Sequence, residues 1–266
     1  MKQKIATTLL SCCLLVPVAQ AEDLPKYLQL ARDFVANTKP ENNAYTLGKS
    51  FTRMPGDLFA SSYVVSADCS GFVEEMFRRG DSTTLNNLAT QKFKNRHSIH
   101  DWYRSILQEE AFTRITKVTD LKPGDVAVWL YKGSGQHHTP GHMLLLDSVP
   151  VKIKPRKPMA EGLDQYEFAL IDTSQEAKSR DDTRFVSDEA LRDENEAKGK
   201  ERGTVASPNY KGVGRGHMRF YADSEGNLKG AAFSFPKAKF HGVDNDWDIV
   251  VGRPRSEERR VGKECL

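Results

Sequence analysis

One stretch decides the fold of this chain: Ser66-Ala67-Asp68-Cys69-Ser70-Gly71-Phe72-Val73-Glu74-Glu75-Met76-Phe77. The apolar residues after Gly71 recur at helical spacing, which predicts an amphipathic helix with one buried face. A short polar side chain, either Ser66 or Asp68, is expected to cap the helix by accepting a bond from a free backbone N–H. Cys69 lies in the first turn on the inward side. Because the helix N-terminus carries partial positive charge, we expect the pKa of this thiol to be lowered and the nucleophilic thiolate to be favoured.

Residues 1–21 have the composition of a secretory signal peptide. Lys2 and Lys4 supply a basic start, Ile5 to Val18 is an apolar run, and Ala19-Gln20-Ala21 is a small-residue cleavage pattern. We therefore expect the mature chain to start at Glu22 and the protein to be secreted or periplasmic.

Two alternatives remain open for this N-terminal segment. A membrane anchor is disfavoured because the apolar run is shorter than the ~20 residues that a span needs. Lipid attachment at Cys12 is the other, although Leu10 fits the lipidation pattern poorly. No later stretch is long and apolar enough to cross a bilayer, so stable membrane insertion is not expected.

The last residues, 254–266, resemble the translation of a sequencing adaptor, and we interpret them as an artefact. A real charged tail is the alternative, and it would be solvated. The interpretation leaves residues 22–253 as a single domain with insertions at 149–160 and 175–216. A chain of roughly 230 residues can bury a substantial core without disulfides.

Cysteine count and charge set two further bounds. The chain has four cysteines; Cys12 and Cys13 leave with the signal and Cys265 lies in the suspect tail. Cys69 alone remains, so no internal disulfide is expected. Without the two end segments, the 39 basic and 36 acidic side chains become 33 of each. That balance gives no reason to expect a nucleic-acid partner, and the oligomeric state stays open.

The order of the patterns predicts helices first and an antiparallel sheet afterwards. Loops are expected at 43–62 and in both insertions, the second with a short helix at 188–197. This order is typical of an α+β domain, with N-terminal helices packed on an antiparallel sheet. Helices are predicted at 24–37, 66–80 and within 85–112, and strands at 126–131, 141–147, 166–172, 217–222, 228–235 and 248–251.

Two polar side chains are predicted to meet at one edge of that sheet. His142 starts a buried strand and Asp172 ends the next strand, and in an antiparallel pair these ends lie side by side. If the N-terminus of the Cys69 helix points there, thiol, imidazole and carboxylate line up as nucleophile, base and orienting group.

These residues carry a resemblance to a known family. Asp68-Cys69-Ser70-Gly71-Phe72-Val73 resembles the cysteine motif of the NlpC/P60 family of papain-like cysteine peptidases. Pro123-Gly124-Asp125-Val126 is similar to the turn that the family places between its cysteine and its histidine. Gly141-His142-Met143 fills the histidine position, and Leu170-Ile171-Asp172-Thr173-Ser174 fills that of the third polar residue. Tyr45-Thr46-Leu47-Gly48 is similar to a segment that lines the family's site.

The resemblance covers about residues 45–174 and implies a fold and an activity. It implies the papain-like NlpC/P60 fold and a hydrolase of cell-wall peptides, acting on peptidoglycan peptide stems without a cofactor or metal. Aspartate at the third position and the two insertions depart from the family and leave the substrate in doubt. The implied catalytic residues are Cys69, His142 and Asp172, and the implied substrate-binding residues are Tyr45, Asp68 and Ser70.

Each of these residues also has a purely structural interpretation. Cys69 can be a buried small hydrophobe, His142 a hydrogen-bonded core histidine, Asp172 a turn cap and Tyr45 a packing residue. His142 and the loop histidines His137 and His138 could suggest a metal site, but the sequence offers no convincing further ligands. His97 and His100 are expected at the surface.

Two other functions stay open at this level. A non-catalytic envelope binding module on the same scaffold is favoured by the insertions. An amidase or acyltransferase acting on another secreted substrate would use the same residues.

Overall fold

The computed structural model describes residues 24–88, 96–132, 140–184, 211–235, 238–243 and 247–255. The predictions for the signal peptide and for the helix at 188–197 lie outside these residues. So does nearly all of the segment 254–266, although Pro254 still pairs with Phe112 in the sheet.

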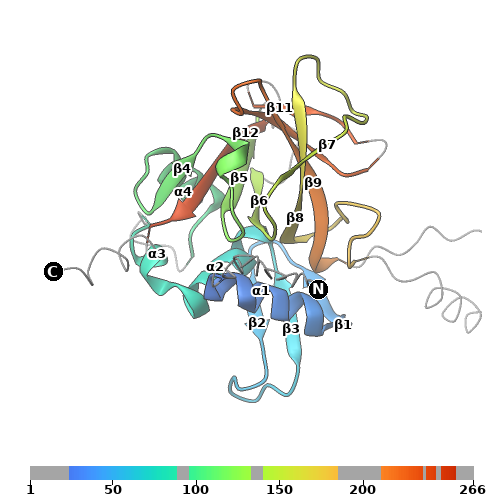
Figure 1. Cartoon of the computed structure of the whole chain (residues 1–266). Helices are drawn as coiled ribbons and strands as arrows, with labels where there is room; N and C mark the ends of the chain where they lie inside the picture. Colours follow the sequence, from blue (N-terminus) through green and yellow to red (C-terminus); the bar gives the residue numbers. More distant parts are fainter. Residues whose placement is uncertain are drawn as a thin grey trace, which may run out of the picture.

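The described residues form a mixed α+β structure in which the helices come from the first half of the chain (Figure 1). Asp68 caps the helix that starts at Cys69, because its carboxylate accepts the Gly71 N–H at 2.8 Å. Ser66, the other candidate cap, bonds to Thr46 instead, with 2.9 Å between the hydroxyl oxygens. The helices are α1 Lys26–Asn37, α2 Cys69–Gly80, α3 Ser82–Asn86, α4 Ile99–Leu107 and the 3-10 helix η1 Val118–Asp120.

A small sheet, in the order β1-β3-β2, precedes α2. It consists of β1 Thr38–Tyr45, β2 Ser50–Arg53 and β3 Tyr63–Ala67, and β1 runs parallel to β3. The prediction of a loop over 43–62 was therefore wrong in part. Most side chains of β1 and β2 are exposed or half-buried, so the strands lack a clear alternation of apolar and polar residues. Without that alternation the sequence pattern does not predict them as strands.

The main sheet has nine strands in the order β11-β10-β9-β8-β6-β5-β12-β4, with β7 paired to β8, and all of its pairs are antiparallel. The predicted α+β class with a mostly antiparallel sheet is confirmed. The strands are β4 Phe112–Ile115, β5 Val126–Tyr131, β6 Gly141–Leu146, β7 Val151–Ile153, β8 Asp164–Ser174, β9 Gly212–Ala222, β10 Leu228–Phe233, β11 His241–Gly242 and β12 Trp247–Pro254.

Each face of this sheet has its own apolar cluster. Val128, Met143 and Leu145 face the helices and pack in one cluster with the buried side of α2. Their neighbours along the strands, such as Trp129 and Leu144, face the other way into a second cluster. The alternation follows from the period of two along a strand, and it places His142 on the same face as Leu144.

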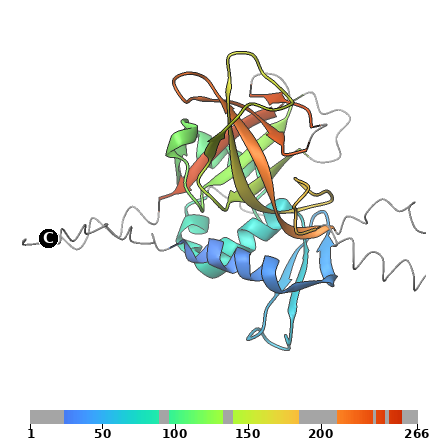
Figure 2. The ribbon, with the colours of Figure 1, turned by 45° about the vertical axis from the view of Figure 1, so that its right-hand side comes forward.

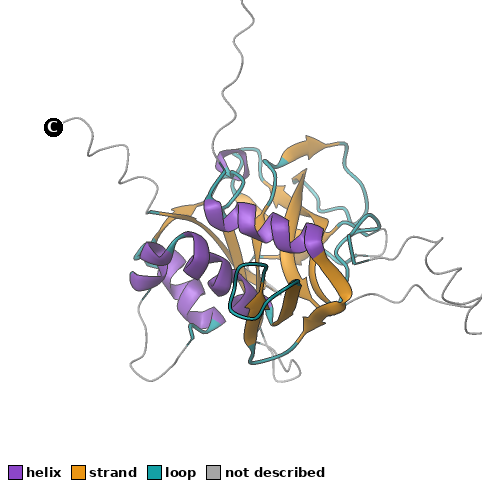
Figure 3. Cartoon of the chain, turned by 90° about the horizontal axis from the view of Figure 1, so that it is seen from below, coloured by secondary structure: helices purple, strands orange, loops and turns teal. Residues whose placement is uncertain are grey.

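The main sheet also curls toward closure. The Leu228 N–H donates to the Thr116 carbonyl and the Val118 N–H donates to the Gly226 carbonyl, both at 2.9 Å. These bonds join the chain after β4 to the turn between β9 and β10. The helices and the small sheet gather at one end of the curled sheet (Figures 1 and 2), and α1 lies across that end in the view from below (Figure 3).

Both predicted insertions contain ordered structure that contradicts a plain loop. In 149–160, β7 pairs with β8 as an exposed edge strand, and its Lys152 and the prolines that follow are typical of a protected edge. In 175–216, residues 212–216 belong to β9, and Arg184 is 1% exposed rather than on the surface. None of the described helices is long and apolar enough to cross a bilayer.

Candidate functional site

The site forms where β6 and β8 separate. The two strands pair only at Leu145 with Ile171 and at Leu146 with Leu170. Beyond Ile171, β8 continues along β9 as far as Ser174. The start of β6 therefore lacks a strand partner on its β8 side, and the N-terminus of α2 faces this opening.

The Cys69 sulfur lies at the opening. It accepts hydrogen bonds from the backbone N–H groups of Met143, the residue after His142, and of Ser70. The side chain is buried, with the whole residue 6% exposed. Backbone register and helix position thus bring the thiol next to the strand that carries His142.

His142 and Asp172 meet across the same opening, as the sequence predicts. Their Nε2 and Oδ2 atoms are 2.6 Å apart, and both residues are buried. When Nε2 carries the proton and donates to the ionised carboxylate, Nδ1 keeps its lone pair and can act as a base. The imidazole is also held by the Trp129 ring, with 5.0 Å between the ring centroids.

The expectation of a lowered thiol pKa was wrong. Burial raises the pKa of Cys69 to about 12, and the negative charge of Asp68 adds to this effect. The bonds from Met143 and Ser70 act in the opposite direction but are weaker. The helix N-terminus does not outweigh the removal of the thiolate from water, so the resting thiol is protonated.

The imidazole is neutral as well. Burial lowers the pKa of His142, the hydrogen bond with Asp172 raises it, and the positive charge of Lys178 lowers it again, with a net fall below the ordinary value. A protonated thiol and a neutral imidazole are the resting states that general-base activation requires, in which the proton moves as the sulfur attacks.

Asp172 is held as a carboxylate by cations that sequence reasoning missed. Burial alone would raise the pKa of Asp172, but Arg184, Lys178 and the bond from His142 outweigh burial and hold it far below the usual range. Arg184 pairs with Oδ1, and the Lys178 Nζ lies 3.7 Å from Oδ2. Both cations belong to the segment that was expected to be a surface loop.

Arg184 ties that segment, Gln175–Arg184, to β8 and β9. Its guanidinium donates to the backbone carbonyls of Glu176, Asp172 and Gly214 at 2.9, 3.1 and 3.2 Å. Its Nη1 also lies 3.3 Å from the Asp182 carboxylate. In the sequence, Arg184 is one arginine in a charged stretch. That pattern does not show whether the side chain is buried or exposed.

Asp68 and Ser70 hold the loop around the thiol. Besides capping α2, Asp68 accepts the Gly48 N–H at 2.9 Å, and the Ser70 hydroxyl donates to Asp68 at 3.2 Å. The Arg96 guanidinium pairs with Asp68 and donates to the Ser70 oxygen at 2.5 Å. These contacts give Asp68 and Ser70 a positioning role, and Arg96 is a third residue missed from the sequence, after Arg184 and Lys178.

A cavity of about 320 Å³ opens in front of Cys69. Tyr45, from the end of β1, lines it, and burial together with the charges at Cys69 and Asp68 raises the pKa of this phenol, which therefore stays protonated. The volume of this cavity and the polar groups that converge on it are typical of a ligand site. The lining residues are Tyr45, Leu47, Gly48, Asp68, Cys69, Ser70, Arg96, Ser98, Ile99, Pro140 and Gly141.

The Pro123-Gly124-Asp125 turn supports the end of β6. The Gly124 N–H donates to the Leu146 carbonyl at 2.8 Å, and Gly124 has a φ of +94°, which few residues other than glycine adopt. The Asp125 carboxylate is buried and receives a bidentate pair from Arg253, with both bonds 2.9 Å long. The turn is therefore structural.

The structure does not test the metal site of His137, His138 and His142, because only His142 lies in the described residues. His97 is 8% exposed, so its predicted surface position was wrong. Its ring Nδ1 lies 3.4 Å from Glu74. Within the described ranges, no three histidine, cysteine, aspartate or glutamate side chains converge as metal ligands.

Comparisons with known proteins add little to the geometry. No family model and no solved structure matches the chain. The chain is similar to an uncharacterized protein of Acanthamoeba polyphaga mimivirus, with 25% identity over 198 residues that cover 72% of this chain and 78% of that protein. Because that protein is itself uncharacterized, the likeness brings no activity or substrate to this chain.

Proposed function

We propose that the protein is a secreted cysteine hydrolase of peptide or amide bonds with a papain-like NlpC/P60 fold. The observation that carries the proposal is the buried His142–Asp172 hydrogen bond beside the strand residue whose N–H bonds to the Cys69 sulfur. The cavity in front of the thiol supplies room for a substrate carbonyl.

The residues take distinct chemical roles in this proposal. His142 Nδ1 takes the thiol proton as the sulfur of Cys69 bonds to the substrate carbonyl carbon. The same imidazole then gives the proton to the leaving amine as the C–N bond breaks. Water hydrolyses the resulting thioester, which releases the carboxylic acid and restores the thiol. Asp172 fixes the imidazole tautomer and stabilises its transient positive charge.

Peptidoglycan peptide stems are the proposed substrate, in a bacterial envelope. The support is the resemblance of the Cys69 motif together with the expected signal peptide. An amidase or acyltransferase of another secreted substrate would use the same three residues, so the substrate has to be identified by assay.

A panel of purified muropeptides tests the proposal. We expect the wild-type protein to release new amines and carboxylates from at least one of them. The Cys69→Ala and His142→Ala variants should be inactive, and Asp172→Asn should be slower by about 10²–10⁴-fold. Lys211→Ala, an exposed change outside the site, is the matched control. Equal or absent cleavage by wild type and Cys69→Ala across the panel would contradict the proposal.

A binding module without catalysis is the second candidate, and a specific observation favours it. Cys69 is 6% exposed and the pKa of its thiol is raised to about 12. A buried cysteine that only contributes to packing would have the same properties. Binding of the same muropeptides with equal affinity by wild type and Cys69→Ala, without turnover, would favour this candidate.

A further inference from the structure

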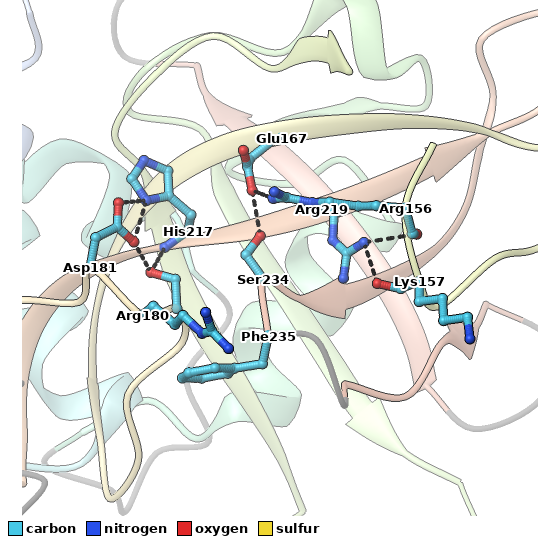
Figure 4. Close-up of a pocket in the computed structure, with 10 residues that line it drawn as sticks. Arg156, Lys157, Glu167, Arg180, Asp181, His217, Arg219, Ser234 and Phe235 are labelled. Carbon is cyan, nitrogen blue, oxygen red and sulfur yellow. Dashed lines mark hydrogen bonds and ion pairs between the residues drawn. The ribbon is translucent and has the colours of Figure 1, made fainter. Parts of the chain in front are cut away.

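A second cavity, of about 570 Å³, lies on the outer face of β8 and β9 (Figure 4). Glu167, His217 and Arg219 line it, and they alternate along the two strands with residues of the interior cluster such as Phe168 and Met218. None of its lining residues lines the cavity in front of Cys69. Its lining consists of Arg156, Lys157, Glu167, Ser179, Arg180, Asp181, His217, Arg219, Ser234 and Phe235.

Arg219 is a buried cation with no carboxylate partner among the described residues. It is 1% exposed, and its guanidinium donates to neutral oxygens only: the Lys157 and Phe233 carbonyls at 3.0 Å, and the Arg156 carbonyl and the Gln165 side chain at 3.2 Å. Its Nε has no hydrogen-bond partner in that part of the chain. A buried positive charge left in this state is costly, and an anion would relieve the cost.

The carboxylates in the cavity are already engaged. Glu167 accepts from Arg156 and from the Ser234 hydroxyl, the latter at 2.7 Å. Asp181 accepts the Ser179 hydroxyl at 2.6 Å and lies 3.0 Å from the His217 Nδ1. Neither carboxylate forms an ion pair with Arg219 among the described residues, although the charge of Glu167 acts on this arginine.

Two exposed cations add to the unmatched positive charge. Arg180 and Lys157 line the cavity, and neither makes an ion pair with another described residue. Figure 4 shows Arg180 and Phe235 on one side of the cavity and Arg156 and Arg219 on the other. The cavity thus offers positive charge and hydroxyl groups beside one aromatic ring.

We propose that this cavity binds a small organic phosphate. A phosphate monoester carries about −1.5 to −2 charge at neutral pH, which matches the unpaired cations better than one carboxylate does. The exposed, planar guanidinium of Arg180 suits phosphate oxygens, and the buried charge of Arg219 lies behind it in the cavity lining. The Phe235 ring provides an apolar wall for the organic part of the ligand, which the volume beyond a bare phosphate can hold.

Calorimetric titration of the full chain with phenyl phosphate, at constant ionic strength, tests this site. We expect saturable binding by wild type that is tighter than that of inorganic phosphate. Arg180→Ala, which removes an exposed side chain without breaking a described bond, should weaken binding at least tenfold. Arg219→Lys should also weaken it, and Lys211→Ala should bind like wild type.

Three outcomes would overturn the proposal. They are no saturable binding of either phosphate, unchanged affinity of Arg180→Ala, and benzoate binding as tight as phenyl phosphate, which would indicate a carboxylate ligand. Cys69→Ala is expected to bind phenyl phosphate like wild type. The result is therefore independent of the proposed hydrolase activity.

Discussion

At Cys69, burial and the position at the helix N-terminus have opposite effects on the pKa of the thiol. Desolvation and the neighbouring Asp68 raise its pKa, whereas two backbone N–H groups lower it, and burial dominates. On the order of one thiol in 10⁵ is ionised at pH 7 when its pKa is about 12. In the proposed mechanism, reactivity near neutral pH therefore depends on proton transfer to His142.

This balance predicts an unusual pH profile for alkylation of Cys69 by iodoacetamide. We expect a slow wild-type rate near neutral pH that becomes slower still in His142→Ala. Above pH 9 both rates should rise and converge, because direct ionisation then supplies the thiolate without the base. Mass spectrometry of a Cys12→Ala, Cys13→Ala, Cys265→Ala chain isolates the label on Cys69. A profile with a midpoint near pH 8 in both proteins would contradict the raised pKa.

At the scale of elements, the segment Gln175–Arg184 supplies side chains to the site and is not a plain surface loop. One side of it delivers Lys178 and Arg184 to the Asp172 carboxylate. The other side, through Arg180, lines the cavity on the outer face. A short chain segment thus contacts both faces of the sheet where β8 ends.

Arg184→Met should be strongly destabilising. It leaves the buried Asp172 carboxylate without its closest cation, and removing one partner of a buried ion pair costs roughly 3–5 kcal/mol. Adding Asp172→Asn should recover part of this loss, because the uncompensated charge is then gone. Urea unfolding at pH 7 measures both variants.

Arg215→Met is the matched control for that measurement. Its guanidinium also pairs with a buried carboxylate, that of Asp147, but the arginine side chain is 43% exposed. We expect a much smaller loss, because the remaining carboxylate keeps its bond from Arg32. Equal losses in Arg184→Met and Arg215→Met would show that burial of the arginine is not the deciding factor.

The sequence predicted those parts of the site that depend on local patterns. The helix at Cys69 and the strands that carry His142 and Asp172 each have a clear period of hydrophobicity, and antiparallel pairing then brings the polar ends together. Arg184 and Arg96 could not be found in this way, because no local pattern around either arginine shows that its side chain is directed at Asp172 or Asp68. The raised pKa of Cys69 was also out of reach, since it depends on the depth of burial.

At the scale of the whole molecule, the sheet is locked by contacts between distant parts of the chain. β12 lies between β5 and β4. Arg253, near the end of β12, forms the bidentate pair with Asp125 that supports the turn before β5. Burial raises the pKa of Asp125 above its ordinary value even though Arg253 lowers it, so the ionised carboxylate depends on this arginine.

Arg253→Met should therefore destabilise the fold in a pH-dependent way. Because the folded pKa of Asp125 is raised, the folded state binds more protons than the unfolded state between the two pKa values, and stability falls as pH rises through them. Losing Arg253 raises the folded pKa further. We expect a loss of about 3 kcal/mol at pH 7 and a smaller loss at pH 4, measured by denaturant unfolding at both values. An equal loss at both pH values would indicate that the pair contributes by packing alone.

The position of β12 in the sheet has a consequence for biosynthesis. The strands on either side of it, β4 and β5, leave the ribosome more than a hundred residues before Trp247 does. Both must wait with unsatisfied backbone edges until the last strand arrives, and exposed edges of this kind invite aggregation. A polypeptide built in this way gains from being kept unfolded by chaperones until synthesis is complete.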